Sequence, residues 1–206
     1  MKQKTAIICL SRVNGGMELA SVKLARLLSQ DVEVEFIARD NSYIANRKEH
    51  FENYDINLHI VNFSSNFSFK LIFTVREILK NSNIKNIIFL GASEMKSLYF
   101  ATLGLDINFI IRQGSKKTTS KKDFFHKLLY SNVNYFVGNC EYMRKNIINI
   151  LPIPKNATVT RIYSSLKLQE NVNFKALNNT IDLVHVGRIN KGKGQFEVIK
   201  ACEILK

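Results

Sequence analysis

The sequence predicts an α/β protein in which helices flank a mainly parallel β-sheet. Two observations support this fold class. Apolar runs of strand length alternate with helical patterns through most of the 206 residues, and such alternation is typical of right-handed βαβ units. Hydrophobic residues make up 46% of the chain and charged residues 23%, which supplies enough apolar side chains for a buried core and argues against a disordered protein.

The N-terminal half contains the clearest elements. Residues 5–10 (TAIICL) form a continuous apolar run, as expected for a strand that is buried on both faces. A turn at 11–16 leads into a helical stripe over 17–28. The same alternation predicts further strands at 32–38, 58–63, 86–90 and 107–111, and helices at 67–80 and 94–103.

The C-terminal half continues the alternation and then changes character. Pro152 and Pro154 end one helix. The stretch 164–180 is rich in Asn and Lys without periodicity, so we expect a linker between a domain at 1–163 and the beginning of a second domain at 181–206. The predicted elements are helices at 121–130, 141–150 and 195–205, and strands at 134–137, 159–163 and 181–186.

Two strand-to-helix loops are candidate ligand sites, because parallel sheets bind ligands at the carboxyl ends of their strands. Gly15 and Gly16 let the backbone turn sharply beside a helix N-terminus, which favours an anion. A plain tight turn is the alternative. The loop 187–194 (GRINKGKG) places Arg188 and Lys193 within reach of phosphate oxygens. A solvated basic loop is the alternative there.

Neither loop carries the fingerprint of a common nucleotide cofactor. The Gly-x-Gly-x-x-Gly pattern of dinucleotide-binding proteins is absent from the first loop. In the second loop, Gly194 stands where the phosphate loop of nucleoside triphosphatases has the Ser or Thr that holds magnesium. The sequence therefore disfavours both of these classes.

The second loop resembles a known family. Residues 184–195 (VHVGRINKGKGQ) look like the donor-binding motif of GT-B glycosyltransferases of family 4, in which a strand ends in Gly-Arg and a Lys-Gly follows. Segments 14–18 (NGGME), 24–28 (LARLL) and 137–145 (VGNCEYMRK) resemble other parts of the family in the same order. The resemblance implies a Rossmann-like N-terminal domain on the acceptor side, plus the first βα unit of a second Rossmann-like domain that binds the nucleotide-sugar.

The resemblance also implies an activity. We expect retaining transfer of a hexosyl or related sugar from a nucleotide-sugar to a lipid-linked or polysaccharide acceptor, in lipopolysaccharide or capsule synthesis. Arg188 and Lys193 would bind the donor diphosphate, and the loop of Gly15 and Gly16 would cap it. Members are thought to rely on the leaving phosphate, so no catalytic residue is assigned. No metal and no cofactor other than the donor substrate are expected.

Two features depart from the family pattern. Members often carry a His after the fifth strand of the first domain, whereas this chain has Gln113 there, a neutral hydrogen-bonding group. Glu94 and Glu18 are further candidates for sugar or acceptor contacts, although a carboxylate in a first helical turn is also ordinary dipole chemistry.

The second departure is length. The chain ends one strand and one helix into the second domain, so a truncated, non-catalytic chain that at most binds an anionic ligand is the alternative expectation.

The charge of the chain bears on its partners. Thirty Lys and Arg against 17 Asp and Glu give a net charge of +13, which attracts polyanions, although a biased genome would also produce it. Lysines at 116–127 with Phe124 and Phe125 between them suggest a helix lying on an anionic membrane; a helix whose apolar residues face the core is the alternative. No nucleic-acid-binding motif is present, so nucleic acid is not an expected partner.

Cysteine usage and hydropathy bear on location. The three cysteines are odd in number and far apart, which fits neither a disulfide framework nor a metal site. No apolar run approaches the roughly 20 residues that span a bilayer. We expect a cytoplasmic protein, with peripheral attachment to the inner face of the plasma membrane as a further expectation.

Overall fold

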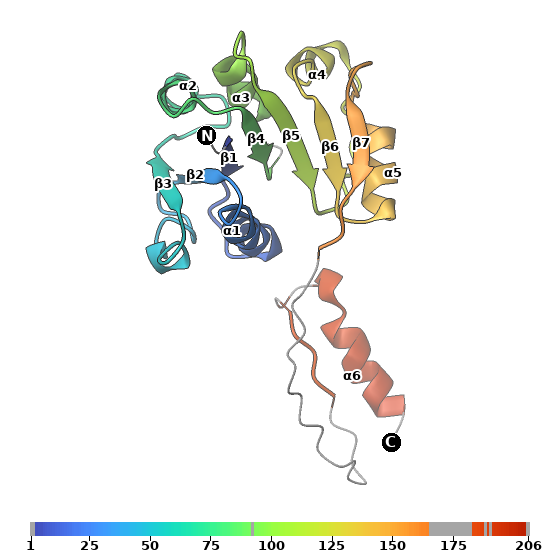
Figure 1. Ribbon diagram of the computed structural model, residues 1–206. Helices are drawn as coiled ribbons and strands as arrows, with labels where there is room; N and C mark the ends of the chain where they lie inside the picture. The colour runs from blue at the N-terminus through green and yellow to red at the C-terminus, as the bar shows by residue number, and fades with distance from the viewer. Residues whose placement is uncertain (1–2, 92, 165–182, 188, 190, 205–206) are drawn as a thin grey trace. The chain divides into compact units, whose positions relative to one another are not determined.

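The computed structural model describes residues 3–91, 93–164, 183–187, 189 and 191–204. Contacts divide the chain into two units, Met1–Ser165 and Leu166–Lys206. The first unit holds a parallel sheet whose strands lie in the order β3-β2-β1-β4-β5-β6-β7 (Figure 1). The predicted α/β class and parallel sheet are therefore confirmed.

The elements of the first unit follow the predicted alternation to within a few residues. A short 3-10 helix, η1 (Lys48–His50), is the element that the sequence pattern missed. The strands are β1 (Lys4–Cys9), β2 (Glu33–Arg39), β3 (Ile56–Val61), β4 (Asn86–Phe89), β5 (Asn108–Gln113), β6 (Tyr135–Gly138) and β7 (Thr158–Arg161), and the helices are α1 (Gly16–Leu28), α2 (Phe69–Asn81), α3 (Met95–Thr102), α4 (Phe124–Leu129) and α5 (Glu141–Ile150).

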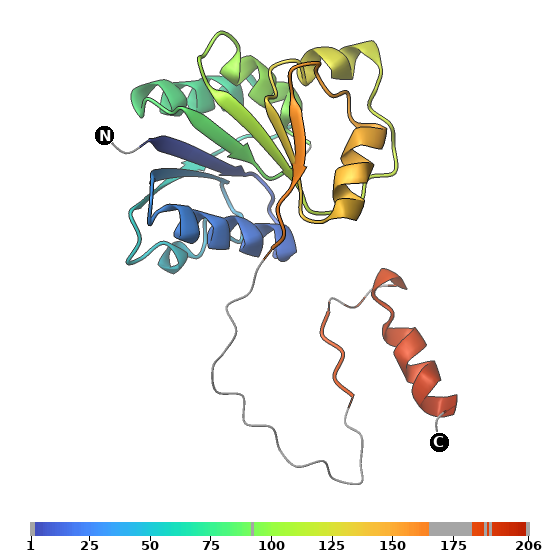
Figure 2. The same ribbon diagram turned by 45° about the vertical axis from the view of Figure 1, so that its right-hand side comes forward.

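The sheet is buried between two apolar cores. Successive side chains of a strand point to opposite faces, so Ile8 packs in a core with α2, α3 and α5, whereas Ile7 packs in a smaller core with α1. Figure 2 shows α1 on one side of the sheet and α2 and α3 on the other. This double cover explains why β1 reads as a continuous apolar run.

The α1 side of the sheet is covered less completely than the opposite side. In the described part of the first unit, α1 is the one helix on this side, and it packs against β1 and β2. A pocket of about 340 Å³ lies beyond it. Its walls are Leu24, Ile88, Ile110, Arg112, Tyr135, Val137, Thr160 and Ile162.

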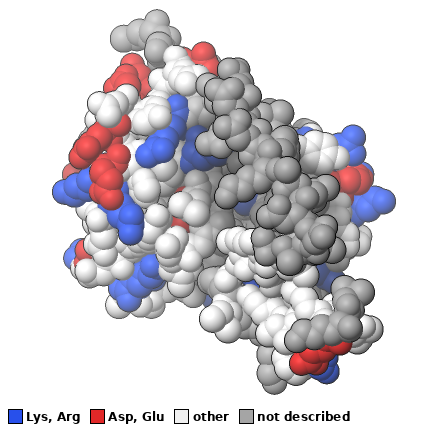
Figure 3. All heavy atoms as spheres, turned by 90° about the horizontal axis from the view of Figure 1, so that it is seen from below, with Lys and Arg blue, Asp and Glu red and all other residues white. Residues whose placement is uncertain are grey.

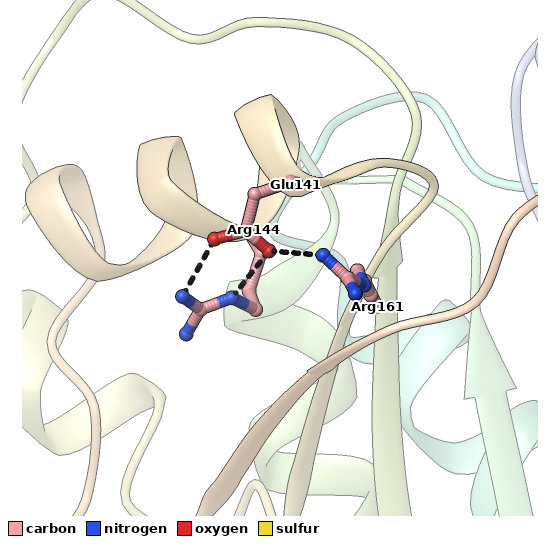
Figure 4. Close-up of polar contacts among 3 residues, drawn as sticks. All are labelled: Glu141, Arg144 and Arg161. Atoms are coloured by element: carbon pink, nitrogen blue, oxygen red, sulfur yellow. Dashed lines mark hydrogen bonds and ion pairs between the residues drawn. The ribbon is translucent and has the colours of Figure 1, made fainter.

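An ion-pair cluster joins α5 to the last strand. The guanidinium of Arg144 donates to both carboxylate oxygens of Glu141, at 2.7 and 2.9 Å, and Arg161 at the end of β7 lies 3.2 Å from the same carboxylate (Figure 4). The hydrogen bonds from Arg144, together with the charge of Arg161, lower the pKa of Glu141 to about 2.

The second unit contributes a turn and a helix to the described residues. The 3-10 turn η2 (Lys191–Lys193) leads into α6 (Gln195–Ile204), as predicted. Residues 183–186 are exposed and form no strand, so the prediction of a strand is wrong for these four residues. A single strand without neighbouring strands has no partners for its backbone hydrogen bonds. The remaining two residues of the predicted strand, and the predicted linker beyond Ser164, lie outside the described residues.

Candidate functional site

A pocket of about 320 Å³ opens at the carboxyl edge of the sheet in the first unit. The chain leaves β1 toward β2 on one side and returns through β3 to β4 on the other. This reversal is the switch point at which open α/β sheets bind ligands. We call it the carboxyl-edge pocket; its walls are Leu10, Ser11, Arg12, Met17, Arg39, Leu90, Gly91, Ser93, Glu94, Arg112, Gln113, Gly114, Ser115 and Lys117.

The charge of the carboxyl-edge pocket is mostly positive. Four cationic side chains line it, against the single carboxylate of Glu94, and the cations are Arg12, Arg39, Arg112 and Lys117. Among the described residues, no ion pair joins any of these five side chains to a partner. Arginine keeps its charge in proteins, so the pocket holds a concentration of unpaired positive charge.

Arg39, the last residue of β2, is partly fixed by its neighbours. Its guanidinium carbon lies 4.0 Å from the centre of the Phe63 ring, and its Nη2 donates to the Phe63 carbonyl at 2.9 Å. Its Nε is buried and lacks a hydrogen-bond partner. Burial lowers the pKa of Arg39, and the charge of Arg12 lowers it further. A buried donor without a partner is costly, so an acceptor atom that reached Nε would stabilise it.

Glu94 lies at the start of α3, after β4, and is only 8% exposed. It occupies the N-cap position of α3, but its side chain makes no capping hydrogen bond. Its position at the N-terminus of α3 still agrees with the alternative of an ordinary interaction with the helix dipole. Burial raises its pKa, and the positive charge of Arg39 opposes that rise.

Gln113, the last residue of β5, lies in the wall of the pocket and is held by α5. Its Nε2 donates to Oδ1 of Asn146 at 2.8 Å. The same Asn146 bonds both backbone groups of Lys117, accepting from its N–H at 3.0 Å and donating to its carbonyl at 2.9 Å. Gln113 and Asn146 thus position the loop that carries Lys117 into the pocket.

Gly15, Gly16 and Glu18 lie beside the pocket, at the start of α1, rather than in its walls. Neither glycine adopts a positive φ, so the turn itself does not require glycine. A Cβ on Gly15 would come within 3.0 Å of Oε2 of Glu18, whereas one on Gly16 would meet nothing within 4 Å. Glu18 is buried, and its Oε1 has no hydrogen-bond partner. Of the five candidates in the first unit, the structure brings Glu94 and Gln113 together.

The donor loop belongs to the second unit. Lys193 is exposed at the end of η2, and Arg188 lies outside the described residues. Gly194 has a φ of +77°, and its carbonyl accepts from the N–H of Val198 at 3.1 Å to open α6. This left-handed conformation favours glycine over the Ser or Thr of a phosphate loop.

Arg12, Arg39 and Arg112 line the pocket but were not among the site residues predicted from the sequence. Arg12 follows β1 by three positions, and Arg39 ends β2. The rule that strand ends carry ligand-binding side chains would have selected both. Their convergence with Arg112 depends on the strand order, which the linear sequence does not reveal. The described part of the chain contains no group of three or more His, Cys, Asp or Glu side chains that could hold a metal ion.

A second basic surface surrounds α4, and we call it the α4 surface. Phe124 is 84% exposed, and Phe125 and Leu128 are exposed as well, so the expectation that these apolar side chains face the core is wrong; Leu129 fills that role. The Lys96 ammonium lies 5.2 Å from the centre of the Phe125 ring. We define the α4 surface as Lys96, Lys121, Lys122, Phe124, Phe125 and Leu128, together with Lys116 of the preceding loop, whose ammonium lies 5.8 Å from the centre of the Tyr142 ring of α5.

Positive charge also occurs elsewhere. Figure 3 shows Lys and Arg side chains on several parts of the face seen from below. Burial and the nearby Lys117 and Lys96 lower the pKa of Lys121, so Lys117 of the carboxyl-edge pocket and Lys121 of the α4 surface lie near each other. No helix in the described ranges combines the length and apolarity needed to cross a membrane.

Solved structures of similar fold are known, although no protein-family model and no curated protein matches the chain. A glycosyltransferase from Rickettsia africae has a TM-score of 0.61 at 16% identity, over 77% of this chain and 42% of that one. Anabaena HepE in complex with UDP and glucose has a TM-score of 0.59 at 11% identity (80% and 45%). The lipopolysaccharide outer core galactosyltransferase WaaB has 0.56 at 16% identity (82% and 47%).

These matches define the fold. A putative UDP-N-acetylglucosamine 2-epimerase from Listeria monocytogenes is also similar, with a TM-score of 0.52 at 14% identity (72% and 42%). The chain spans less than half the length of each of these structures. The likeness shows the Rossmann-like parallel sheet of GT-B proteins, a fold that serves both sugar transfer and epimerisation.

Proposed function

We propose that the protein is a glycosyltransferase that moves a sugar from a nucleotide-sugar donor to a lipid-linked or polysaccharide acceptor in cell-surface glycan synthesis, with retention of anomeric configuration. The observation that carries this proposal is the basic carboxyl-edge pocket at the switch point of a GT-B sheet. Two similar structures support it, because HepE is seen with UDP and glucose and WaaB is a galactosyltransferase.

The proposed roles divide between the two units. Arg188 and Lys193 of the second unit bind the donor diphosphate, and the loop of Gly15 and Gly16 caps it. Cations that face a leaving diphosphate stabilise the charge that grows as the glycosidic bond breaks. The carboxyl-edge pocket receives the acceptor, with Glu94 and Gln113 as candidate contacts to its hydroxyls. No metal takes part in this proposal.

The α4 surface attaches the protein to an anionic membrane. Each lysine near such a surface contributes about 1 kcal/mol, and the exposed ring of Phe124 can enter the headgroup boundary. This attachment would hold the protein at the membrane, where a lipid-linked acceptor is found. The proposed location is the cytoplasmic face of the plasma membrane.

Turnover of nucleotide-sugars tests the proposed activity. The full chain is incubated with UDP-glucose, UDP-galactose and UDP-N-acetylglucosamine, and the released UDP and the sugar product are measured. Because no acceptor is present, the sugar passes to water, so release of UDP together with a free sugar unchanged at C2 supports transferase chemistry. Proton NMR of the anomeric signal reports retention or inversion. A C2-epimerised sugar would instead indicate an epimerase. Donor binding without turnover would support the alternative of a chain that binds an anionic ligand only.

A further inference from the structure

We propose that the carboxyl-edge pocket binds an anionic group of the acceptor, a phosphate or a carboxylate, rather than a neutral sugar alone. The identification of the ligand as the acceptor rests on the proposed function, whereas the binding of an anion rests on the pocket itself. The inference specifies the class of acceptor, which the glycosyltransferase fold alone does not determine.

The first argument is the unbalanced charge. Four cations and one carboxylate line the pocket. Arg12 and Lys117 are exposed, whereas Arg39 and Arg112 are half-buried. Burying charge without a partner costs free energy, and burial lowers the pKa of these two guanidinium groups. A pocket that evolved for neutral hydroxyls would gain little from this arrangement. An anion would neutralise it.

The second argument is the geometry of the arginines. Arg39 is stacked on Phe63 and bonded to the Phe63 carbonyl, yet its Nε is buried without a partner. Arg112 is held from one end, where its Nη2 donates to the Ser164 hydroxyl at 2.9 Å. Each guanidinium is therefore fixed in place with donors to spare, and its planar fork matches carboxylate and phosphate oxygens.

The remaining carboxylate is compatible with an anion. Glu94 is buried and its pKa is raised. Its single negative charge leaves the four cationic side chains of the pocket in excess, so an anion can still bind there.

The acceptor is a better source of this anion than the donor. All the residues that line the pocket belong to the first unit, whereas the basic residues proposed for the donor diphosphate belong to the second. Lys117 also links the pocket to Lys121 of the α4 surface, where a membrane-borne acceptor would arrive. A phosphate in the pocket can thus come from a lipid phosphate or from a phosphorylated glycan.

Calorimetric titration of the full chain tests the inference with five probes: glucose, glucose 1-phosphate, glucuronate, farnesyl phosphate and UDP. We expect at least one anionic probe to bind about tenfold or more tightly than glucose. Binding of farnesyl phosphate alone would indicate that the anion is a lipid phosphate. Binding of glucose 1-phosphate or glucuronate would indicate a charged glycan. Equal affinity for glucose and all the anions would overturn the inference.

Two pocket variants and one control locate the binding. Arg39→Gln should weaken the anionic probe about ten- to a hundredfold. Arg12→Gln changes an exposed side chain and leaves the core intact. It should also weaken binding of the anionic probe, and it provides the test if Arg39→Gln fails to fold. Lys80→Gln, an exposed charge on α2, removes the same charge elsewhere and should leave affinity unchanged. Equal effects of Arg12→Gln and Lys80→Gln would contradict a pocket site.

Competition separates this inference from the proposed function. UDP that displaces the anionic probe would show that the pocket holds the donor phosphates, which overturns the acceptor assignment. Donor turnover without anion binding would refute the anionic acceptor and leave the transferase standing. Arg39-dependent anion binding without any donor turnover would support the pocket and refute the transferase.

Discussion

The carboxyl-edge pocket and the α4 surface are both basic, but their charges stand in different surroundings. In the pocket, Arg39 is stacked, hydrogen-bonded and partly shielded from solvent, and it lies near a buried carboxylate. On the α4 surface, exposed and half-buried lysines accompany exposed phenylalanines. Fixed, partly dehydrated guanidinium groups suit a small anion with defined geometry, whereas flexible lysines beside apolar rings suit a membrane surface. The net charge of the chain does not distinguish these roles; the local environment does.

Removing charge from the α4 surface should separate the two regions most clearly. Replacing Lys116, Lys121 and Lys122 by Gln should weaken co-sedimentation with anionic vesicles about a hundredfold, because each lysine contributes about 1 kcal/mol. Lys117 is kept because it lines the pocket. Binding of glucose 1-phosphate should change little.

The matched control for that variant is the replacement of Lys48, Lys70 and Lys80 by Gln, which removes three exposed charges from other elements. Vesicle binding that falls equally in both variants would show that overall charge, not the α4 surface, is responsible. Wild-type protein that does not sediment with anionic vesicles would refute membrane attachment directly.

The donor loop is a third basic region, in the second unit, and should respond differently from both. Lys193→Ala should remove a charge-assisted contact worth about 1.5–3 kcal/mol, a ten- to hundredfold loss in donor turnover. The loss should appear in kcat as well as in donor affinity, because the diphosphate charge grows in the transition state. Steady-state kinetics with the preferred donor measure it. Unchanged kinetics would remove Lys193 from the donor site.

The apolar half of the α4 surface has its own test. Phe124→Ser should lower vesicle affinity about tenfold or more, since burying a phenylalanine side chain stabilises by about 1.5–3 kcal/mol. The melting temperature should hardly move, because the ring is 84% exposed. A large fall in thermal stability with intact vesicle binding would mean that the ring packs within the protein.

Within the pocket, Gln113 should matter less than the arginines. Gln113→Ala removes a neutral hydrogen bond to Asn146, worth about 0.5–1.5 kcal/mol, so acceptor affinity should fall about two- to tenfold. Asn146→Ala releases the same loop and should have a similar effect. If Gln113→Ala is far more damaging than Asn146→Ala, Gln113 contacts the acceptor itself and is not only a positioning residue.

The smallest expected effect concerns stability, away from both basic regions. The folded-state pKa of Glu141 is about 2, against an ordinary value of 4.5. A carboxyl whose pKa is depressed by folding stabilises the protein above its unfolded pKa, and this stabilisation is lost as the pH falls through that interval. Glu141→Gln should therefore lower the melting temperature near neutral pH. The difference from wild type should shrink between pH 4.5 and about 2; a constant difference would exclude the ionised carboxylate as its cause.

The sequence predicts the sheet well because the physics of its strands is local. A strand buried on both faces is expected to be apolar, and β1 shows this directly. Glu94 and Gln113 were identifiable for a related reason, because each follows or ends a strand. Strand order is not local. It places Arg39 of β2 and Arg112 of β5, with β1 and β4 between their strands, in the walls of one pocket, so the basic pocket could be recognised only in the structure.

The sequence also could not predict which apolar side chains are exposed to solvent. Phe124 and Leu129 lie on the same short helix, yet one faces solvent and the other fills the core. Periodicity over six residues is too short to determine which face packs. The donor-binding roles of Arg188 and Lys193 stay predictions from the family resemblance.

The most direct test of the central claim is a crystal structure of the chain with glucose 1-phosphate. We predict that its phosphate lies within hydrogen-bond distance of Arg39 and Arg112 in the carboxyl-edge pocket. A phosphate bound only by lysines of the α4 surface, with the pocket empty at saturating ligand, would contradict the division of roles between the two basic regions.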